Sequence, residues 1–120
     1  MAETAQIESL DEWESLCSSS SSTPVFLLKH STTCPISAAA HEQFMTAARQ
    51  HETDDDVRFA IVKVIEARPV SNKIAEQLEI HHASPQLIAI KDGKAIWAES
   101  HYAITSKAID AVLDERLRRQ

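Results

Sequence analysis

The feature that most constrains this chain is a junction at which a short apolar run gives way to a helix-forming segment. Val25 to Leu28 are continuously apolar, which is typical of a strand buried on both faces. Pro35 suits the first turn of a helix, and Ser37 to Arg49 is rich in helix-forming residues. The sequence therefore predicts a strand, a tight polar turn and a helix that starts at Cys34.

The predicted location of Cys34 has chemical consequences. The free N–H groups and the positive end of the helix dipole stabilise an anion there, and the thiolate is the nucleophilic form of cysteine. Thr33 and Pro35 mark a polar turn rather than a core, so we interpret Cys34 as a reactive thiol and not as a small buried apolar residue.

Ser37 occupies the position where a Cys-x-x-Cys motif would carry its second sulfur. A serine hydroxyl can donate a hydrogen bond to a neighbouring thiolate, but it cannot attack a mixed disulfide and release the partner. The alternative interpretation of Ser37 is an ordinary residue of the first helical turn. Under either interpretation, the predicted chemistry at Cys34 needs an external thiol to finish.

Composition and charge restrict the class of protein. A length of 120 residues suits one domain, which we expect to span residues 1–120. The net charge of −6, from 18 acidic and 12 basic residues, argues against a nucleic acid or an anionic membrane as the partner. The beginning of the sequence has no signal-like pattern and no segment approaches the length of a membrane span, so we expect a cytoplasmic protein.

Cys17, the other of the two cysteines, is predicted to lie in a different environment. A first helix is predicted over Ile7 to Cys17, with Ser9 and Glu12 as a Ser-x-x-Glu capping box. Cys17 falls on the apolar stripe of this helix beside Trp13, so we interpret it as a core residue rather than as a resolving thiol. In a reducing compartment two cysteines more often mean a reactive thiol and a bystander than a structural disulfide.

The middle of the chain alternates between polar loops and regular elements. Residues 50–56 form an acidic loop, whose charges we interpret as solvated surface. Val57 to Val64 is rich in β-branched residues and predicts a central strand. Arg68 to Ser71 predicts a turn, after which Ser71 caps a short helix over Asn72 to Glu79.

The last third of the chain predicts a hairpin and a final helix. The Asp92-Gly93 pair holds the only glycine and lies between two apolar strands, Gln86 to Ile90 and Ala95 to Glu99. Thr105 can cap a helix over Ser106 to Arg119. The order α-β-α-β-α-β-β-α predicts an α/β fold, with a mixed four-stranded sheet and helices on both faces.

This topology brings three separated stretches to one edge of the sheet. Cys34 lies past the carboxyl end of its strand, where parallel α/β sheets usually place their sites. If the Gln86 strand runs antiparallel to the Val25 strand, then Ser84-Pro85 lies beside Cys34, and the returning strand brings His101 to the same edge. An imidazolium there could stabilise a thiolate or protonate a departing thiol, although His101 could equally be a surface loop residue.

The other histidines carry weaker signals. His30 precedes the reactive turn and is a second candidate for the role suggested for His101. The adjacent pair His81-His82 does not predict a metal site, because neighbouring residues rarely point to one ion and no pair with ligand spacing accompanies it. We expect His41 and His51 at the surface.

The order of elements, with a cysteine opening one helix and a Ser-Pro opening the third strand, resembles the thioredoxin-like fold over nearly the whole chain. The details resemble the YtxJ-type monothiol bacilliredoxins more closely. Three stretches in combination carry this resemblance: Thr33-Cys34-Pro35-Ile36-Ser37, Ser84-Pro85-Gln86 leading to Lys91-Asp92-Gly93-Lys94, and Trp97-Ala98-Glu99-Ser100-His101 before Ile104-Thr105.

The resemblance implies a thioredoxin-like domain with a cis Ser84-Pro85 bond and no bound cofactor or metal. It implies a cytosolic bacterial enzyme whose co-substrate is bacillithiol, a small thiol with a malate group, and whose partners are client proteins with bacillithiol-capped cysteines. Cys34 would be the nucleophile, and Thr33, His101 and the Ser84 backbone are candidate donors to the bacillithiol carboxylates. The family motif assigns no role to Cys17.

Three alternatives remain open. A glutathione-linked monothiol glutaredoxin with an iron-sulfur role carries a Cys-Gly-Phe-Ser motif, whereas this chain has Pro35 in place of the glycine. A peroxiredoxin carries a Thr-x-x-Cys site with an upstream proline and is longer. A non-catalytic thioredoxin-like binding module would hold a client without turnover.

Overall fold

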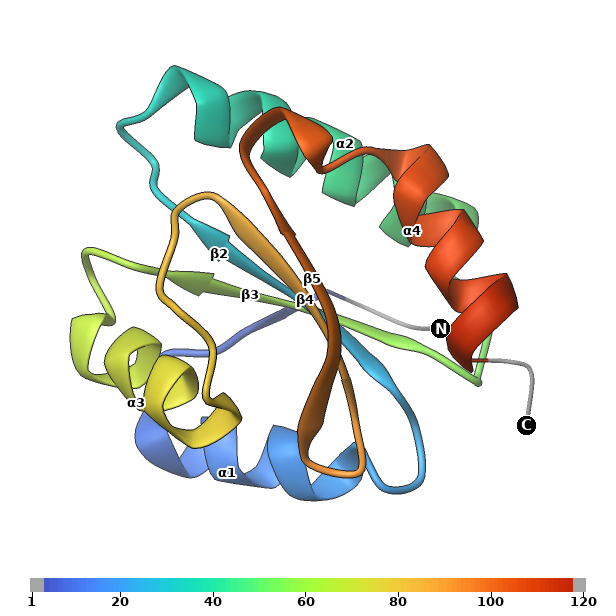
Figure 1. The fold of residues 1–120 in the computed structure, drawn as a ribbon, viewed down its shortest axis with the longest axis horizontal. Helices are drawn as coiled ribbons and strands as arrows, with labels where there is room; N and C mark the ends of the chain where they lie inside the picture. Colours follow the sequence, from blue (N-terminus) through green and yellow to red (C-terminus); the bar gives the residue numbers. More distant parts are fainter. Residues whose placement is uncertain (1–3, 118–120) are drawn as a thin grey trace.

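The computed structural model describes residues 4–117 and arranges them as a sheet with helices on both faces (Figure 1). The sheet has five strands in the order β1-β3-β2-β4-β5; β1, β3 and β2 are parallel, and β4 and β5 are antiparallel to their neighbours. The elements in chain order are β1 (Ala5–Gln6), α1 (Leu10–Ser19), β2 (Val25–His30), α2 (Pro35–Gln50), β3 (Arg58–Lys63), α3 (Arg68–Leu78), β4 (Gln86–Lys91), β5 (Lys94–Ser100), a 3-10 turn (His101–Ala103), α4 (Ser106–Val112) and a π-helical turn (Leu113–Leu117).

The predicted mixed sheet is confirmed, but the prediction of four strands is one strand short. The additional strand, β1, has two residues, which pair with Ala60 and Ile61 of β3. The amide of Ile7 extends this pairing with a 2.9 Å hydrogen bond to the Ile61 carbonyl. Two residues cannot show the alternation that identifies a strand in a sequence, so only the tertiary pairing reveals β1.

Helix boundaries differ from the predictions in a way that proline explains. α3 begins at Arg68 with Ala67 as its N-cap, so the predicted turn over Arg68 to Ser71 and the predicted Ser71 cap are wrong. Pro69 lies in the first helical turn, where its missing N–H costs no hydrogen bond. Ser71 is instead a buried residue inside the helix.

The other helices keep their predicted caps. α1 is capped by Ser9, whose hydroxyl accepts a hydrogen bond from the Glu12 amide, and it begins at Leu10 rather than at Ile7. Thr105 caps α4 in the same way. The α-helical part of the last segment ends at Val112, and the predicted end at Arg119 lies outside the described residues.

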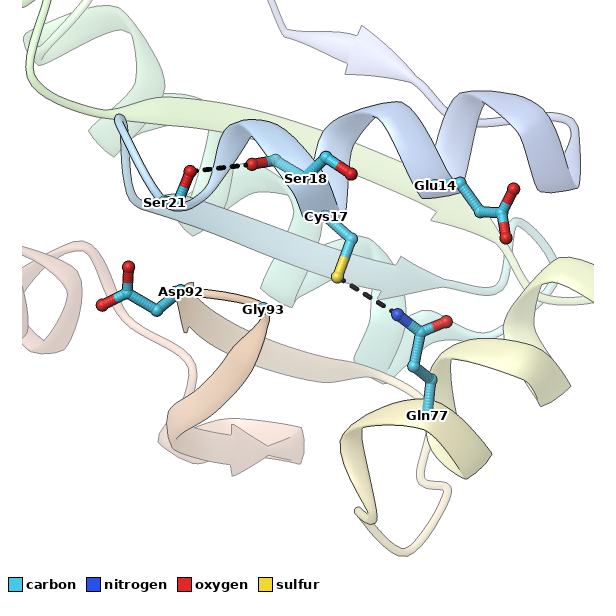
Figure 2. Close-up of a pocket in the computed structure, with 7 residues that line it drawn as sticks. All are labelled: Glu14, Cys17, Ser18, Ser21, Gln77, Asp92 and Gly93. Carbon is cyan, nitrogen blue, oxygen red and sulfur yellow. Dashed lines mark hydrogen bonds between the residues drawn. The ribbon is translucent and has the colours of Figure 1, made fainter.

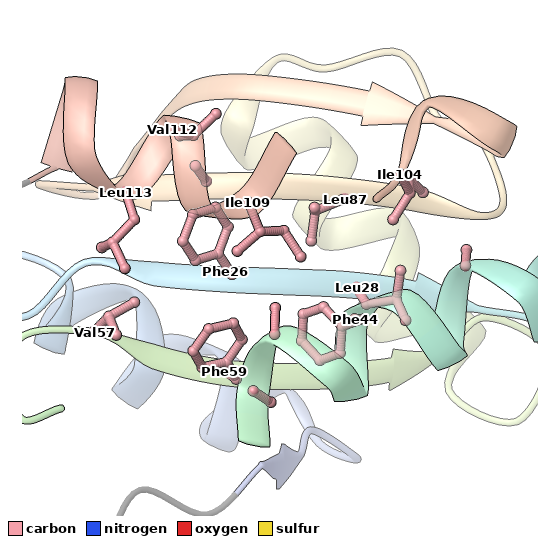
Figure 3. Packing of buried hydrophobic residues seen from close by; sticks show 14 of the residues in the cluster. Phe26, Leu28, Phe44, Val57, Phe59, Leu87, Ile104, Ile109, Val112 and Leu113 are labelled. Atoms are coloured by element: carbon pink, nitrogen blue, oxygen red, sulfur yellow. The ribbon is translucent and has the colours of Figure 1, made fainter. Parts of the chain in front are cut away.

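Two hydrophobic layers lie on the two faces of the sheet. The layer under α2 and α4 contains Phe26, Leu28 and Phe44 (Figure 3), and the layer under α1 and α3 contains Val25 and Leu27. Successive residues of β2 therefore point to opposite faces, and all six are buried. No helix among the described residues has the length and apolar character needed to cross a membrane.

The strand register defines two edges of the sheet. Val25, the first residue of β2, pairs with Ile90, so the Asp92-Gly93 turn lies near the beginning of β2; we call this the hairpin-turn edge. Asp92 and Gly93 have φ angles of 55° and 72°, as a two-residue hairpin turn with both residues left-handed requires. The opposite edge, which contains the carboxyl ends of β2 and β3 and the start of α2, is the Cys34 edge.

Candidate functional site

Cys34 is the N-cap residue of α2. Its backbone is extended, with φ −108° and ψ 124°, and its carbonyl accepts the first helical hydrogen bond from Ala38 at 3.0 Å. The side chain is partly exposed, and the thiol is free. In the part of the chain that the structure describes, no group donates a hydrogen bond to this sulfur, so the positive end of α2 is the anion-stabilising feature next to it.

Ser37 contacts the end of β2 instead of Cys34. Its hydroxyl oxygen accepts a hydrogen bond from the Ser31 amide at 2.9 Å and lies 2.8 Å from Nδ1 of His30. The side chain is fully buried. Ser37 therefore closes the turn that carries Cys34, whereas the sequence suggested a donor to the thiolate. The difference arises because the first turn of α2 directs this side chain inward onto β2.

His30 is a buried member of this turn. Its ring stacks on His41 with a centroid separation of 4.6 Å, and His41, which we expected at the surface, is partly buried. Burial, together with the nearby His41 and Lys63, lowers the pKa of His30, although Glu66 acts in the opposite direction. The imidazole of His30 is therefore neutral at neutral pH, and it serves as a hydrogen-bond partner of Ser37.

The segment Ser84-Pro85 reaches the Cys34 edge. Its peptide bond is cis, and β4 starts directly after it at Gln86, which pairs with Lys29 near the end of β2. Pro85 donates no hydrogen bond, but its carbonyl accepts one from the His101 amide at 3.2 Å. The register thus brings the Cys34 turn, Ser84-Pro85 and the end of β5 to one edge, as the topology predicted.

The other predicted site residues surround this turn without touching the sulfur through hydrogen bonds. Thr33 and Pro35 are exposed, and the Thr33 hydroxyl lies 3.3 Å from that of Ser31. His101 is exposed, in a left-handed conformation with φ 58°. Its side chain makes no hydrogen bond with the described residues, so a role toward a substrate stays a prediction.

Cys17 lies at the hairpin-turn edge, in an open pocket of about 590 Å³ (Figure 2). Its sulfur accepts a 3.3 Å hydrogen bond from Nε2 of Gln77, and its side chain packs close to Gly93. Burial raises the pKa of this thiol, and the Gln77 contact only partly opposes that effect. Its interpretation as a core residue is confirmed by its exposure of 7%.

The two thiols cannot meet in this fold. β2 runs from the hairpin-turn edge to the Cys34 edge, and its six residues span about 20 Å. A disulfide requires Cα atoms within about 7 Å of each other. Cys17 therefore cannot resolve a mixed disulfide on Cys34 unless the fold is opened.

Sequence reasoning missed a polar group beneath the loop that precedes β4. Lys29 is fully buried, and its Nζ lies 3.1 Å from both the Ser71 carbonyl and Nδ1 of His82. Nε2 of Gln86 donates to the His81 carbonyl at 3.0 Å. One signal was available in the sequence. Lys29 directly follows four apolar residues, and a strand buried on both faces is expected to continue into the next residue, so Lys29 could have been predicted to be buried.

Known proteins resemble this chain over most of its length. The family model described as "Monothiol bacilliredoxin BrxC" matches residues 5–109. A solved structure described as an oxidoreductase with a thioredoxin fold is 29% identical, with a TM-score of 0.80 over 90% of this chain and 91% of that chain.

Two thioredoxins show the same fold at lower identity. The thioredoxin of Fasciola hepatica is 18% identical, with a TM-score of 0.74 over 94% of this chain and 100% of that chain. The thioredoxin of Malassezia sympodialis is 19% identical, with a TM-score of 0.74 over 96% of this chain and 91% of that chain. The fold is therefore thioredoxin-like, as the order of elements suggested.

Proposed function

The chain belongs to the monothiol bacilliredoxin family and is a thiol-disulfide oxidoreductase; from that premise we propose that it removes bacillithiol from mixed disulfides on protein cysteines. One observation carries the proposal. Cys34, at the start of α2, is a partly exposed thiol, and the residue three positions later is a buried serine whose hydroxyl is engaged elsewhere. Such a site can accept a thiol cap but has no internal group to remove it.

The reaction has two exchange steps. In the first, the Cys34 thiolate attacks the bacillithiol sulfur of the capped client, the client–bacillithiol S–S bond breaks, and the client sulfur leaves and takes a proton from solvent. Cys34 is then bonded to bacillithiol. In the second, the thiolate of another bacillithiol attacks that sulfur, releases oxidised bacillithiol as a small disulfide and restores the Cys34 thiolate. The client is reduced, and two molecules of bacillithiol are joined.

The charges of the Cys34 edge support an anionic small thiol as co-substrate. The carboxyl ends of β2 and β3 and the segments beside them carry mostly basic side chains, although the chain as a whole has a net charge of −6. The accessible cations among them are Lys63 and Arg68, with Glu66 as an acidic neighbour. Lys29 is fully buried, and the lowered pKa values of His30 and His82 disfavour a positive charge on those two rings. Carboxylates of the bacillithiol malate group would find favourable charge here, with Thr33, His101 and the Ser84 backbone as candidate donors.

The test is removal of bacillithiol from a model protein with a single capped cysteine, in the presence of excess bacillithiol. We expect turnover by the wild type and by Cys17→Ser, and no turnover above background by Cys34→Ser. A glutathionylated version of the same model protein, with excess glutathione, should be processed more slowly. Activity of Cys34→Ser would overturn the assignment of the nucleophile, and equal rates with the two caps would overturn the choice of bacillithiol.

A further inference from the structure

Lys29 is an unusual residue in this fold. It lies on β2 after four apolar residues and before His30, and none of its surface is exposed. Lysine is almost never fully buried unless an opposite charge accompanies it. Among the described residues no carboxylate lies within ion-pair distance of its Nζ; its partners are the Ser71 carbonyl of α3 and the His82 ring.

The position of Lys29 does not favour stability. Burial lowers the pKa of its amine to about 8, so the protein holds a cation where water cannot solvate it. Neither acceptor depends on this lysine. The Ser71 carbonyl belongs to the interior of α3, where the helix supplies its own donor, and His82 is exposed and can bond to water. A buried charge without an opposite charge is costly, and even a buried ion pair can often be replaced by apolar residues of similar volume with a neutral or stabilising effect.

The contacts of Lys29 instead hold a loop. Lys29 and Gln86 are register partners on β2 and β4, and both bond to the segment that precedes β4. Lys29 donates to Nδ1 of His82, and Gln86 donates to the His81 carbonyl. Two residues further along, the same segment ends in the cis Ser84-Pro85 bond, and the Pro85 carbonyl receives the His101 amide.

A second observation marks this place. Three buried side-chain atoms have no hydrogen-bond partner in the described residues, namely Oγ of Ser71, Oγ of Ser84 and Oε1 of Gln86. All three belong to the segments that Lys29 and Gln86 join. Native proteins leave few buried polar atoms without a partner, and those that remain call for an explanation. Here they coincide with a buried charge, beneath the loop that faces Cys34.

We propose that Lys29 is a positioning residue, which together with Gln86 holds the His81–Ser84 loop in the conformation that presents the Ser84 backbone to the capped client. The inference rests on the proposed function, because it concerns how that substrate is held. Lys29 bonds neither to Cys34 nor to Ser37, so its removal changes substrate binding and leaves the thiol itself unaffected. The role of Lys29 in holding the loop explains why the protein keeps a charge at this buried position.

The main test variant is Lys29→Met, with Lys91→Met as a matched control. Lys91 is the last residue of β4, at the hairpin-turn edge. Its substitution therefore removes the same charge far from the loop. We expect Lys29→Met to keep or raise the wild-type melting temperature and to raise KM for the capped client about tenfold, the effect of losing one charge-assisted hydrogen bond. Its kcat and the rate at which iodoacetamide alkylates Cys34 should stay at wild-type values. Lys91→Met should change none of these quantities.

Two further measurements test the contact between Lys29 and His82. His82→Ala removes the acceptor from an exposed position and should reproduce the rise in KM. NMR titration should show a higher pKa for His82 in Lys29→Met, because burial and the Lys29 charge both lower that pKa in the wild type. This titration needs no substrate, so it tests the contact even if the proposed function fails.

Three results would overturn the inference. A lower melting temperature with an unchanged KM would make Lys29 a structural residue. Slower alkylation of Cys34 in Lys29→Met would mean that the lysine acts on the thiol and not on the loop. An unchanged His82 pKa would mean that the Lys29–His82 contact does not form. If the wild type itself does not remove bacillithiol, the proposed function fails, independently of the titration.

Discussion

The two cysteines lie at opposite ends of the same sheet and in opposite surroundings. Cys34 is partly exposed at the start of α2, where backbone N–H groups favour an anion. Cys17 is packed under the hairpin turn, held by Gln77, and its thiol has a pKa raised by burial. The comparison shows that the position of a cysteine relative to its helix, more than the thiol group itself, determines its reactivity: Cys34 precedes the first turn of α2, whereas Cys17 lies inside α1.

The histidines at these two edges also differ, because their pKa values are shifted in opposite directions. At the Cys34 edge, burial and basic neighbours lower the pKa of His30 and of His82. At the far end of α2, His51 lies between Asp54 and Asp110, at 2.7 Å and 2.8 Å, and its pKa is raised. The Cys34 edge therefore disfavours the charged form of its histidines, whereas two carboxylates at the far end of α2 favour the charged form of His51.

The largest effect on stability is expected from Trp13→Ala, which disrupts the packing around Cys17. Trp13 is fully buried, and its Nε1 donates to Oε1 of Gln77 at 3.1 Å, the same residue that holds Cys17. Truncation of such a side chain should lower the free energy of unfolding by about 3–5 kcal/mol, measured by urea denaturation.

The control for this variant is Glu14→Ala, an exposed neighbour on α1 that should change stability by less than about 0.5 kcal/mol. Alkylation of Cys34 in folded Trp13→Ala should proceed at the wild-type rate, because α1 contributes nothing to the Cys34 turn. A changed rate would show that the two edges are coupled.

A smaller and pH-dependent effect is expected from His51→Asn. Burial disfavours the charged imidazole, but Asp110 and Asp54 outweigh it and raise the pKa of His51 in the folded state. The histidine therefore stabilises the fold fully below its unfolded pKa of about 6.5, and the stabilisation disappears as the pH rises through the higher folded pKa. At pH 5.5 the variant should be less stable than the wild type by about 1–2 kcal/mol more than at pH 9.

The measurement is the difference in unfolding free energy between wild type and His51→Asn at both pH values. Taking the difference cancels the other titrating groups, including Lys29, whose lowered pKa acts in the opposite direction. If this difference in unfolding free energy is the same at both pH values, Asp54 and Asp110 do not raise the pKa of His51 in the folded state.

Most of the fold could be predicted because its signals are local. The apolar run of β2, the helix formers after Pro35 and the Asp92-Gly93 turn each determine an element from a few adjacent residues. The predictions that were wrong concern features that depend on tertiary structure. β1 is a strand only because β3 lies beside it, and α3 starts early because Pro69 suits a first turn as well as a loop.

The site shows the same division. The position of Cys34 at the start of a helix and of Ser84-Pro85 at the same edge follow from element order, and the structure contains both. The partner of Ser37 and the burial of Lys29 do not follow, because a sequence does not state which way a side chain turns after its element begins. His51 was expected at the surface for the same reason, since Asp110 is distant in the chain.

The most direct test of the central claim is mass spectrometry of the folded wild type after exposure to oxidised bacillithiol. The account predicts one added bacillithiol per chain, located on Cys34, with Cys17 unmodified until the protein is denatured. An adduct on Cys17 in the folded protein, or a Cys34 that remains free, would contradict it.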